Sequence, residues 1–88
     1  MATERDGRTH KTVDLLQTLI RNACVNDGTA TSGNEVLNSD VLESFLEGPG
    51  VDIETFEPTP GRKSLVARIA GTDATSPSLC LMGHTDVV

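Results

Sequence analysis

The amino-terminal half of the chain has the spacing of apolar residues that is typical of helices. From about residue 12 to residue 25, apolar side chains recur at intervals of three and four, which predicts an amphipathic helix with Thr12 as its N-cap. A turn-rich loop follows, and Ser32 with Glu35 three residues later has the form of a capping box for a second helix. That helix is expected to end at Gly48-Pro49-Gly50, because proline cannot continue the hydrogen-bond ladder.

The period of the pattern changes to two from Val51 onward. Val51 and Ile53 alternate with acidic residues, which predicts a half-buried strand, and residues 64–70 predict a second strand antiparallel to the first. The continuous apolar run Leu79-Cys80-Leu81-Met82 is short enough for a central strand that is covered on both faces. The sequence therefore predicts an α/β fold, with two helices followed by three strands of a mixed sheet in part of a layered domain.

The pattern also divides the chain into two parts, a polar arm at residues 1–11 and part of a larger domain at residues 12–88. Because the chain stops on the apolar pair Val87-Val88, with no helix to cover the last strand, we expect these residues to be the amino-terminal piece of something larger. The arm lacks the apolar stretch of a secretion signal, and no segment approaches the roughly 20 apolar residues of a membrane span. The expected location is the cytoplasm.

Composition narrows the classes of partner. Seven basic and 13 acidic residues give the 88-residue chain a formal net charge of −6, which argues against a nucleic-acid groove or an anionic membrane surface as partner. With Phe45 and Phe56 as the only aromatic residues, the chain has no stacking platform for bases. Cys24 and Cys80 share no C-x-x-C spacing, so neither a zinc knuckle nor a disulfide framework is indicated. Both cysteines are expected to be inert core residues.

The candidate chemistry lies at His84-Thr85-Asp86, directly after the apolar run. Functional side chains of α/β sheets collect at the carboxyl ends of strands, and in an extended backbone His84 and Asp86 would project to the same side. A histidine that binds a metal through one ring nitrogen usually donates its other N–H to a carboxylate or a carbonyl. The residues alone leave other interpretations open: His84 could cap the strand, Asp86 could start a turn, or both could be solvated.

The run Leu79-Cys80-Leu81-Met82-Gly83-His84-Thr85-Asp86-Val87-Val88 resembles the first metal-site motif of a family of zinc-dependent amidohydrolases and exopeptidases. This family includes aminoacylase, acetylornithine deacetylase, succinyl-diaminopimelate desuccinylase, carboxypeptidase G and several dipeptidases. The upstream sequence is similar as well, with Ser32-Gly33-Asn34-Glu35 at the head of the second helix and Leu65-Val66-Ala67-Arg68-Ile69 before the motif. The resemblance covers nearly all of the chain after the polar arm.

The resemblance implies that residues 12–88 are an incomplete part of a three-layer metallopeptidase catalytic domain. His84 would bind one ion of a two-zinc site, and Asp86 would be the catalytic-site carboxylate that orients it; cobalt or manganese could replace zinc. The reaction would be hydrolysis of a peptide or N-acyl amino acid bond by a metal-activated water. The remaining ligands and the general base would lie later in the parent chain, as would any domain through which it forms a homodimer.

Two other hypotheses remain: a different two-metal exopeptidase family that uses an H-x-D strand end, and a non-catalytic remnant or interaction module. For the leading hypothesis we expect the isolated chain to be catalytically inactive and to bind zinc only weakly, and as a fragment it is expected to be marginally stable. Ser32 is expected to be a helix cap and not a nucleophile. The other charged candidates are expected to be solvated, either in the arm, on the second helix or at a loop tip: His10, Asp40, Glu43, Glu47 and Arg62-Lys63.

Overall fold

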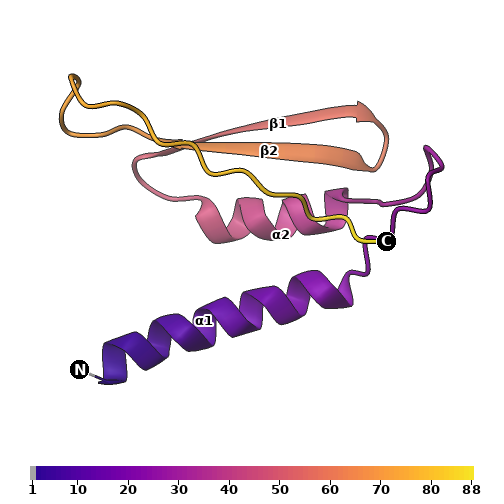
Figure 1. Ribbon diagram of the computed structural model, residues 1–88, viewed down its shortest axis with the longest axis horizontal. Coiled ribbons are helices and arrows are strands. Elements are labelled where there is room, and N and C mark those ends of the chain that lie inside the picture. The colour runs from indigo at the N-terminus through magenta and orange to yellow at the C-terminus, as the bar shows by residue number, and fades with distance from the viewer. Residues whose placement is uncertain (1) are drawn as a thin grey trace.

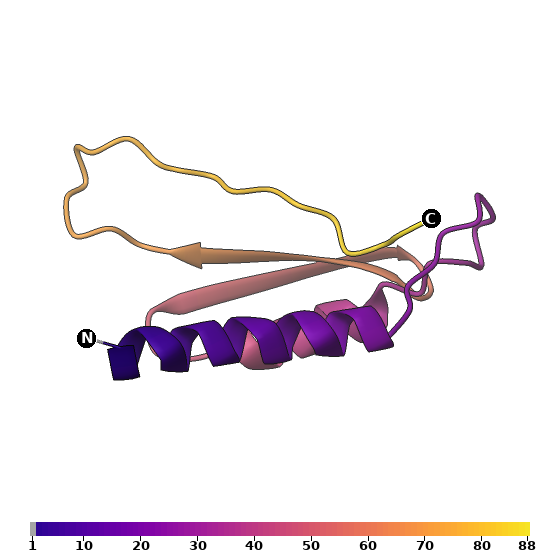
Figure 2. The same cartoon turned by 60° about the horizontal axis from the view of Figure 1, so that its bottom comes forward.

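The computed structural model describes the backbone of residues 2–88 and the side chains of residues 7–88. Two helices, α1 (Ala2–Arg21) and α2 (Val36–Leu46), precede two strands, β1 (Val51–Thr59) and β2 (Arg62–Ile69). The helices lie on one side of the β1–β2 hairpin, and the carboxyl-terminal segment crosses over the hairpin as an extended chain (Figures 1 and 2). A small α/β fold is therefore confirmed, with two strands in its sheet where three were predicted.

Helix α1 begins ten residues earlier than the apolar pattern predicts. Its first residue is Ala2, so most of the expected polar arm is helical, and His10 lies exposed on its surface. Thr12 is an interior residue of α1 whose Oγ1 donates a hydrogen bond to the carbonyl oxygen of Arg8 at 2.9 Å, so it is not an N-cap. The expectation was wrong because the apolar period marks only the amphipathic part of a helix, and polar residues such as glutamate, arginine and lysine also favour helix.

Helix α2 begins at Val36 without the predicted capping box. Ser32 bonds inside its own loop instead: its Oγ donates to the carbonyl oxygen of Thr29 at 2.8 Å and accepts from the backbone N–H of Asp27 at 3.1 Å. Glu35 is the residue before the helix and makes no side-chain cap, since its carboxylate binds the guanidinium of Arg62. A charge-assisted bond of this kind is stronger than a neutral cap, which explains why the pattern was misleading.

The hairpin is antiparallel, as predicted. Val51 pairs with Ile69 and Ile53 pairs with Ala67, and the register becomes irregular between Phe56 and Thr59. Ser39 connects α2 to the sheet, because its Oγ donates a hydrogen bond of 2.5 Å to the carbonyl oxygen of Lys63 on β2. The turn between the strands is thereby fixed close to the start of α2.

Residues 79–82 do not form the predicted third strand. No described residue pairs with this segment, and Leu79, Leu81 and Met82 are 84%, 87% and 93% exposed. Cys80 is exposed as well, so its assignment to the core was wrong, whereas the burial of Cys24 is confirmed. An apolar run becomes a central strand only when strands lie on both of its sides, and the described part of the chain supplies none there.

The carboxyl-terminal segment returns to the fold at its end. Val87 forms a parallel bridge with Val25: its N–H donates to the carbonyl oxygen of Cys24 at 2.9 Å, and its own carbonyl oxygen accepts from the N–H of Asn26 at 2.7 Å. This bridge places the residues before Val87 against the loop between the helices. In the described part of the chain, neither helix is long and apolar enough to cross a membrane.

Candidate functional site

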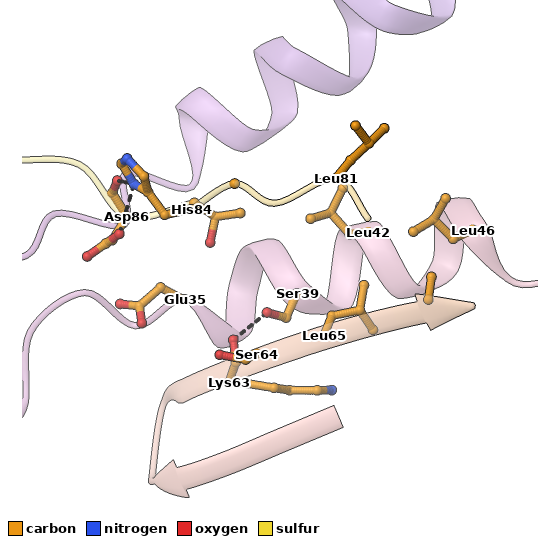
Figure 3. A pocket seen from close by; sticks show the side chains of 13 residues that line it. Glu35, Ser39, Leu42, Leu46, Lys63, Ser64, Leu65, Leu81, His84 and Asp86 are labelled. Atoms are coloured by element: carbon orange, nitrogen blue, oxygen red, sulfur yellow. Dashed lines mark hydrogen bonds and ion pairs between the residues drawn. The ribbon is translucent and has the colours of Figure 1, made fainter. Parts of the chain in front are cut away.

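A groove of about 420 Å³ lies between α2, β2 and the carboxyl-terminal segment. Its two ends differ in polarity: leucine side chains gather at one end, and the other end carries carboxylates and an imidazole (Figure 3). The residues that give the ends their character are Leu42, Leu46, Leu65 and Leu81 at the apolar end, and Glu35, His84 and Asp86 at the polar end. Both residues singled out from the sequence therefore lie at the polar end of one groove.

His84 and Asp86 are in direct contact. Nδ1 of His84 lies 3.1 Å from Oδ1 of Asp86 and 2.9 Å from the carbonyl oxygen of the same residue. With its proton on Nδ1, the ring donates to both oxygens and keeps the lone pair of Nε2 free for another partner. The His84 side chain is 83% exposed, so that second nitrogen is accessible.

Asp86 is held by more than the histidine. Its Oδ2 accepts a hydrogen bond from Nδ2 of Asn26 at 3.0 Å, and Nη2 of Arg62 lies 3.9 Å from the same oxygen. The hydrogen bond from Asn26 is the main cause that lowers the pKa of Asp86, and contact with His84 adds to it. Asp86 is therefore a carboxylate at neutral pH, as an acceptor for an imidazole N–H must be.

Arg62 and Glu35 form the floor of the polar end. Nε of Arg62 lies 2.8 Å from Oε2 of Glu35, and both side chains are largely buried. The other oxygen of Glu35, Oε1, is buried and has no hydrogen-bond partner among the described residues. Gly33 makes this arrangement possible, because a Cβ at that position would collide with Oε1 of Glu35 and come within 3.0 Å of the Arg62 guanidinium. The conformation of Gly33, with φ of 84°, also favours glycine.

The expectation of a solvated basic tip at Arg62-Lys63 was therefore wrong. Lys63 Nζ lies 2.8 Å from Oδ1 of Asp40 and 3.2 Å from Oε1 of Glu43, two residues expected to be free on the surface of α2. These hydrogen bonds raise the pKa of Lys63, so the ammonium ion is favoured. The three residues connect β2 to α2 and bring no carboxylate to His84. Glu47 contributes only its backbone N–H, which ends α2 by donating to the carbonyl oxygen of Glu43.

A buried amide fixes the backbone between His84 and Asp86. Asn38, which is 1% exposed, donates from Nδ2 to the carbonyl oxygen of Thr85 at 3.2 Å and accepts at Oδ1 from Nδ2 of Asn22 at 2.8 Å. Sequence reasoning missed Asn38 because it lies among the apolar residues of α2. It missed Asn26 because 60 positions separate that residue from Asp86. The turn residues around Asn26 predict a loop, but they do not indicate that Asn26 contacts Asp86.

The described residues do not complete a metal site. Among residues 7–88, whose side chains are described, no three His, Cys, Asp or Glu residues lie close enough together to hold a metal ion. A catalytic zinc site needs three protein ligands and a water molecule, so His84 would be one ligand of a set that the described residues do not complete. No family model matches the chain, and the searches of curated proteins and solved structures returned no match.

Proposed function

We propose that this chain supplies one metal ligand, His84, to a metal-dependent hydrolase that cleaves peptide or N-acyl amino acid bonds. The observation that carries the proposal is the contact of His84 Nδ1 with Asp86, at 3.1 Å from Oδ1, which leaves Nε2 accessible. The resemblance of residues 79–88 to the metal-site motif of the amidohydrolase and exopeptidase family gives the reaction class. Zinc is the proposed metal, with cobalt and manganese as alternatives that one imidazole does not distinguish.

The residues of this chain have separate tasks in that reaction. A pair of metal ions, when bound, would lower the pKa of a shared water and polarise the scissile carbonyl. His84 would bind one ion through Nε2, while Asp86 accepts the Nδ1–H, fixes the tautomer and raises the basicity of the ring. The further ligands and the general base are residues that the described chain does not provide, so we expect no hydrolysis by these 88 residues alone.

The test uses the 88-residue chain and compares its two histidines. Zinc is added in steps while the ring signals of both residues are followed by NMR. We expect His84 to respond at a lower zinc concentration than His10, because Asp86 orients the ring of His84, whereas His10 is an exposed residue of α1. In the variant Asp86→Asn, the two histidines should respond in the same concentration range.

A simultaneous response of both histidines in the unmodified chain would contradict the proposal, because His84 would then behave as an ordinary surface imidazole. The variant His84→Ala serves as the control for zinc bound elsewhere and should lose the low-concentration response. Hydrolysis is measured separately on a panel of dipeptides and N-acetyl amino acids. Turnover that survives in His84→Ala would also count against the proposal.

A further inference from the structure

The loop between the helices is fixed beside the candidate site by its backbone. Asn26 donates its N–H to the carbonyl oxygen of Val87 at 2.7 Å, and the N–H of Val87 donates to the carbonyl oxygen of Cys24 at 2.9 Å. Residue 26 is therefore the direct neighbour of the carboxyl-terminal segment that carries Asp86, although the two are 60 positions apart in sequence. The side chain of Asn26 therefore lies close enough to contact the carboxylate of Asp86.

The orientation of the Asn26 amide is determined by a second hydrogen bond. Oδ1 of Asn26 accepts from the backbone N–H of Gly28 at 2.9 Å, so the oxygen end faces its own loop. The amide then has its donor end toward Asp86, where Nδ2 lies 3.0 Å from Oδ2. Nη2 of Arg62 also lies near Oδ2 of Asp86, at the longer distance of 3.9 Å.

These contacts use the two oxygens of Asp86 for different partners. Oδ2 is held by Asn26, and Oδ1 faces Nδ1 of His84 at 3.1 Å. A carboxylate that is held at one oxygen cannot rotate freely, so the other oxygen stays in place as an acceptor for the imidazole. Among residues 7–88, the contacts that the structure shows for the exposed His84 ring are those with Asp86, so its orientation depends on that residue.

We propose that Asn26 is a positioning residue: it holds the carboxylate of Asp86 so that His84 keeps its proton on Nδ1 and presents the lone pair of Nε2. The use of that lone pair for a metal rests on the proposed function. The effect of Asn26 on the tautomer does not, because it is a property of the metal-free chain. The two proposals can therefore fail separately.

The identity of residue 26 provides a sharp test. Aspartate has nearly the same shape as asparagine and can still accept from Gly28, but it replaces the donor near Asp86 with a second negative oxygen. Like charges at hydrogen-bond distance repel, so Asp86 is expected to turn away from residue 26 and lose its alignment with His84. Gln17→Glu is the matched control, because it makes the same amide-to-acid change and adds the same charge on the exposed surface of α1.

The experiment records long-range ¹H–¹⁵N spectra of the histidine rings in the metal-free 88-residue chain. The pH is held at about 9, well above the ordinary histidine pKa of about 6.5, so that the rings are neutral. We expect the Nδ1–H tautomer to be the major form of His84 in the unmodified chain and in Gln17→Glu. It should be less populated in Asn26→Asp, where the carbonyl oxygen of Asp86 remains as an acceptor for the Nδ1–H. His10 should give the same spectrum in all three.

Two results would overturn the proposal: a major Nε2–H tautomer of His84 in the unmodified chain, or an Asn26→Asp spectrum in which the His84 tautomer is unchanged. The backbone amide signal of Val87 reports whether the bridge to residues 24–26 is intact in the variant. If Asn26→Asp disrupts the bridge, the variant Asn26→Ala is measured in its place, and the same decrease of the Nδ1–H form is expected. Preferential zinc binding by His84 with an unchanged tautomer would leave the metal proposal in place and remove Asn26 from it.

Discussion

Among the residues whose side chains are described, Asp27, Asp73 and Asp86 have a pKa that hydrogen bonds lower, and Asp86 differs from the other two in the origin of its partners. The pKa of Asp27 and that of Asp73 are lowered mainly by hydrogen bonds from Thr29 and Thr75, each two residues further along the same loop. The pKa of Asp86 is lowered mainly by Asn26, which belongs to a distant part of the sequence. The local bonds can persist in an unfolded chain, whereas the bond to Asp86 requires the tertiary structure.

We therefore expect Asp86 to make stability depend on pH. A pKa lowered in the folded state means that the folded chain favours the carboxylate. The contribution is complete above the ordinary aspartate pKa of about 3.9 and is lost as the pH falls through the lowered pKa of the folded state. Asp86→Asn should lower the free energy of unfolding at about pH 6, and this difference from the unmodified chain should shrink toward about pH 3. Urea unfolding followed by circular dichroism measures both values.

Asp52→Asn is the control for this comparison, because it removes an exposed carboxylate from β1. It should change the free energy of unfolding little at either pH. If Asp86→Asn and Asp52→Asn behave alike at both pH values, the contacts of Asp86 contribute no measurable stability and the argument from its lowered pKa is wrong.

The sequence predicted only the local half of this site. The alternation of side chains in an extended backbone is enough to anticipate that His84 and Asp86 lie close together, because the two residues are separated by one position. Asn26 and Arg62 reach Asp86 only through the parallel bridge and the packing of β2 on α2. No periodicity in a single sequence contains that information, so these residues could be recognised only in the folded chain.

At the scale of elements, one lysine connects the sheet to the second helix. The Lys63 side chain is largely buried and contacts two acidic residues of α2, at 2.8 Å to Asp40 and 3.2 Å to Glu43. Arg68 on the same strand also has an acidic neighbour, Glu54, but at 3.7 Å and with both side chains well exposed. Exposed ion pairs contribute little because solvent screens them, whereas a sheltered group with two partners is screened less.

This contrast predicts that two substitutions with the same change of charge have different effects. Lys63→Gln should lower the free energy of unfolding, because it leaves Asp40 and Glu43 facing each other without a cation. Arg68→Gln should leave it nearly unchanged. Urea unfolding at low and at high salt measures both, and the loss in Lys63→Gln should be partly retained in high salt. Equal effects of the two variants would show that the Lys63 contacts are screened like any surface pair.

The elements themselves were predicted well wherever local pattern determines them. The hairpin followed from alternation and from a turn whose Gly61 has φ of 86°, and α2 followed from its apolar spacing. The prediction failed where an element depends on something outside itself. The polar start of α1 has no apolar period, and residues 79–82 have the composition of a central strand but no neighbouring strand within the described chain.

The whole molecule is more open than its length requires. A compact domain of this size has a radius of gyration of about 12 Å, and the observed value is 15.4 Å. Among the residues whose side chains are described, the buried ones are few and mostly polar, with Cys24, Asn38 and Ser39 at 2%, 1% and 3% exposure. The largest apolar side chains of residues 79–82 lie outside this core, so much of the apolar surface that could stabilise the chain remains in contact with water.

An extended apolar segment with an unpaired backbone favours association between chains, since it can pair with a strand edge of another copy. We expect the apparent mass of the 88-residue chain, measured by light scattering after gel filtration, to increase with concentration. The double variant Leu79→Lys with Leu81→Lys should remain monomeric over the same range, because charges on an edge oppose such pairing. Thr72→Lys with Ser78→Lys adds the same charge to the same exposed segment without removing apolar surface, and it should associate like the unmodified chain. A monomer at every concentration with a sharp, cooperative thermal transition would contradict both the expected association and the expected marginal stability.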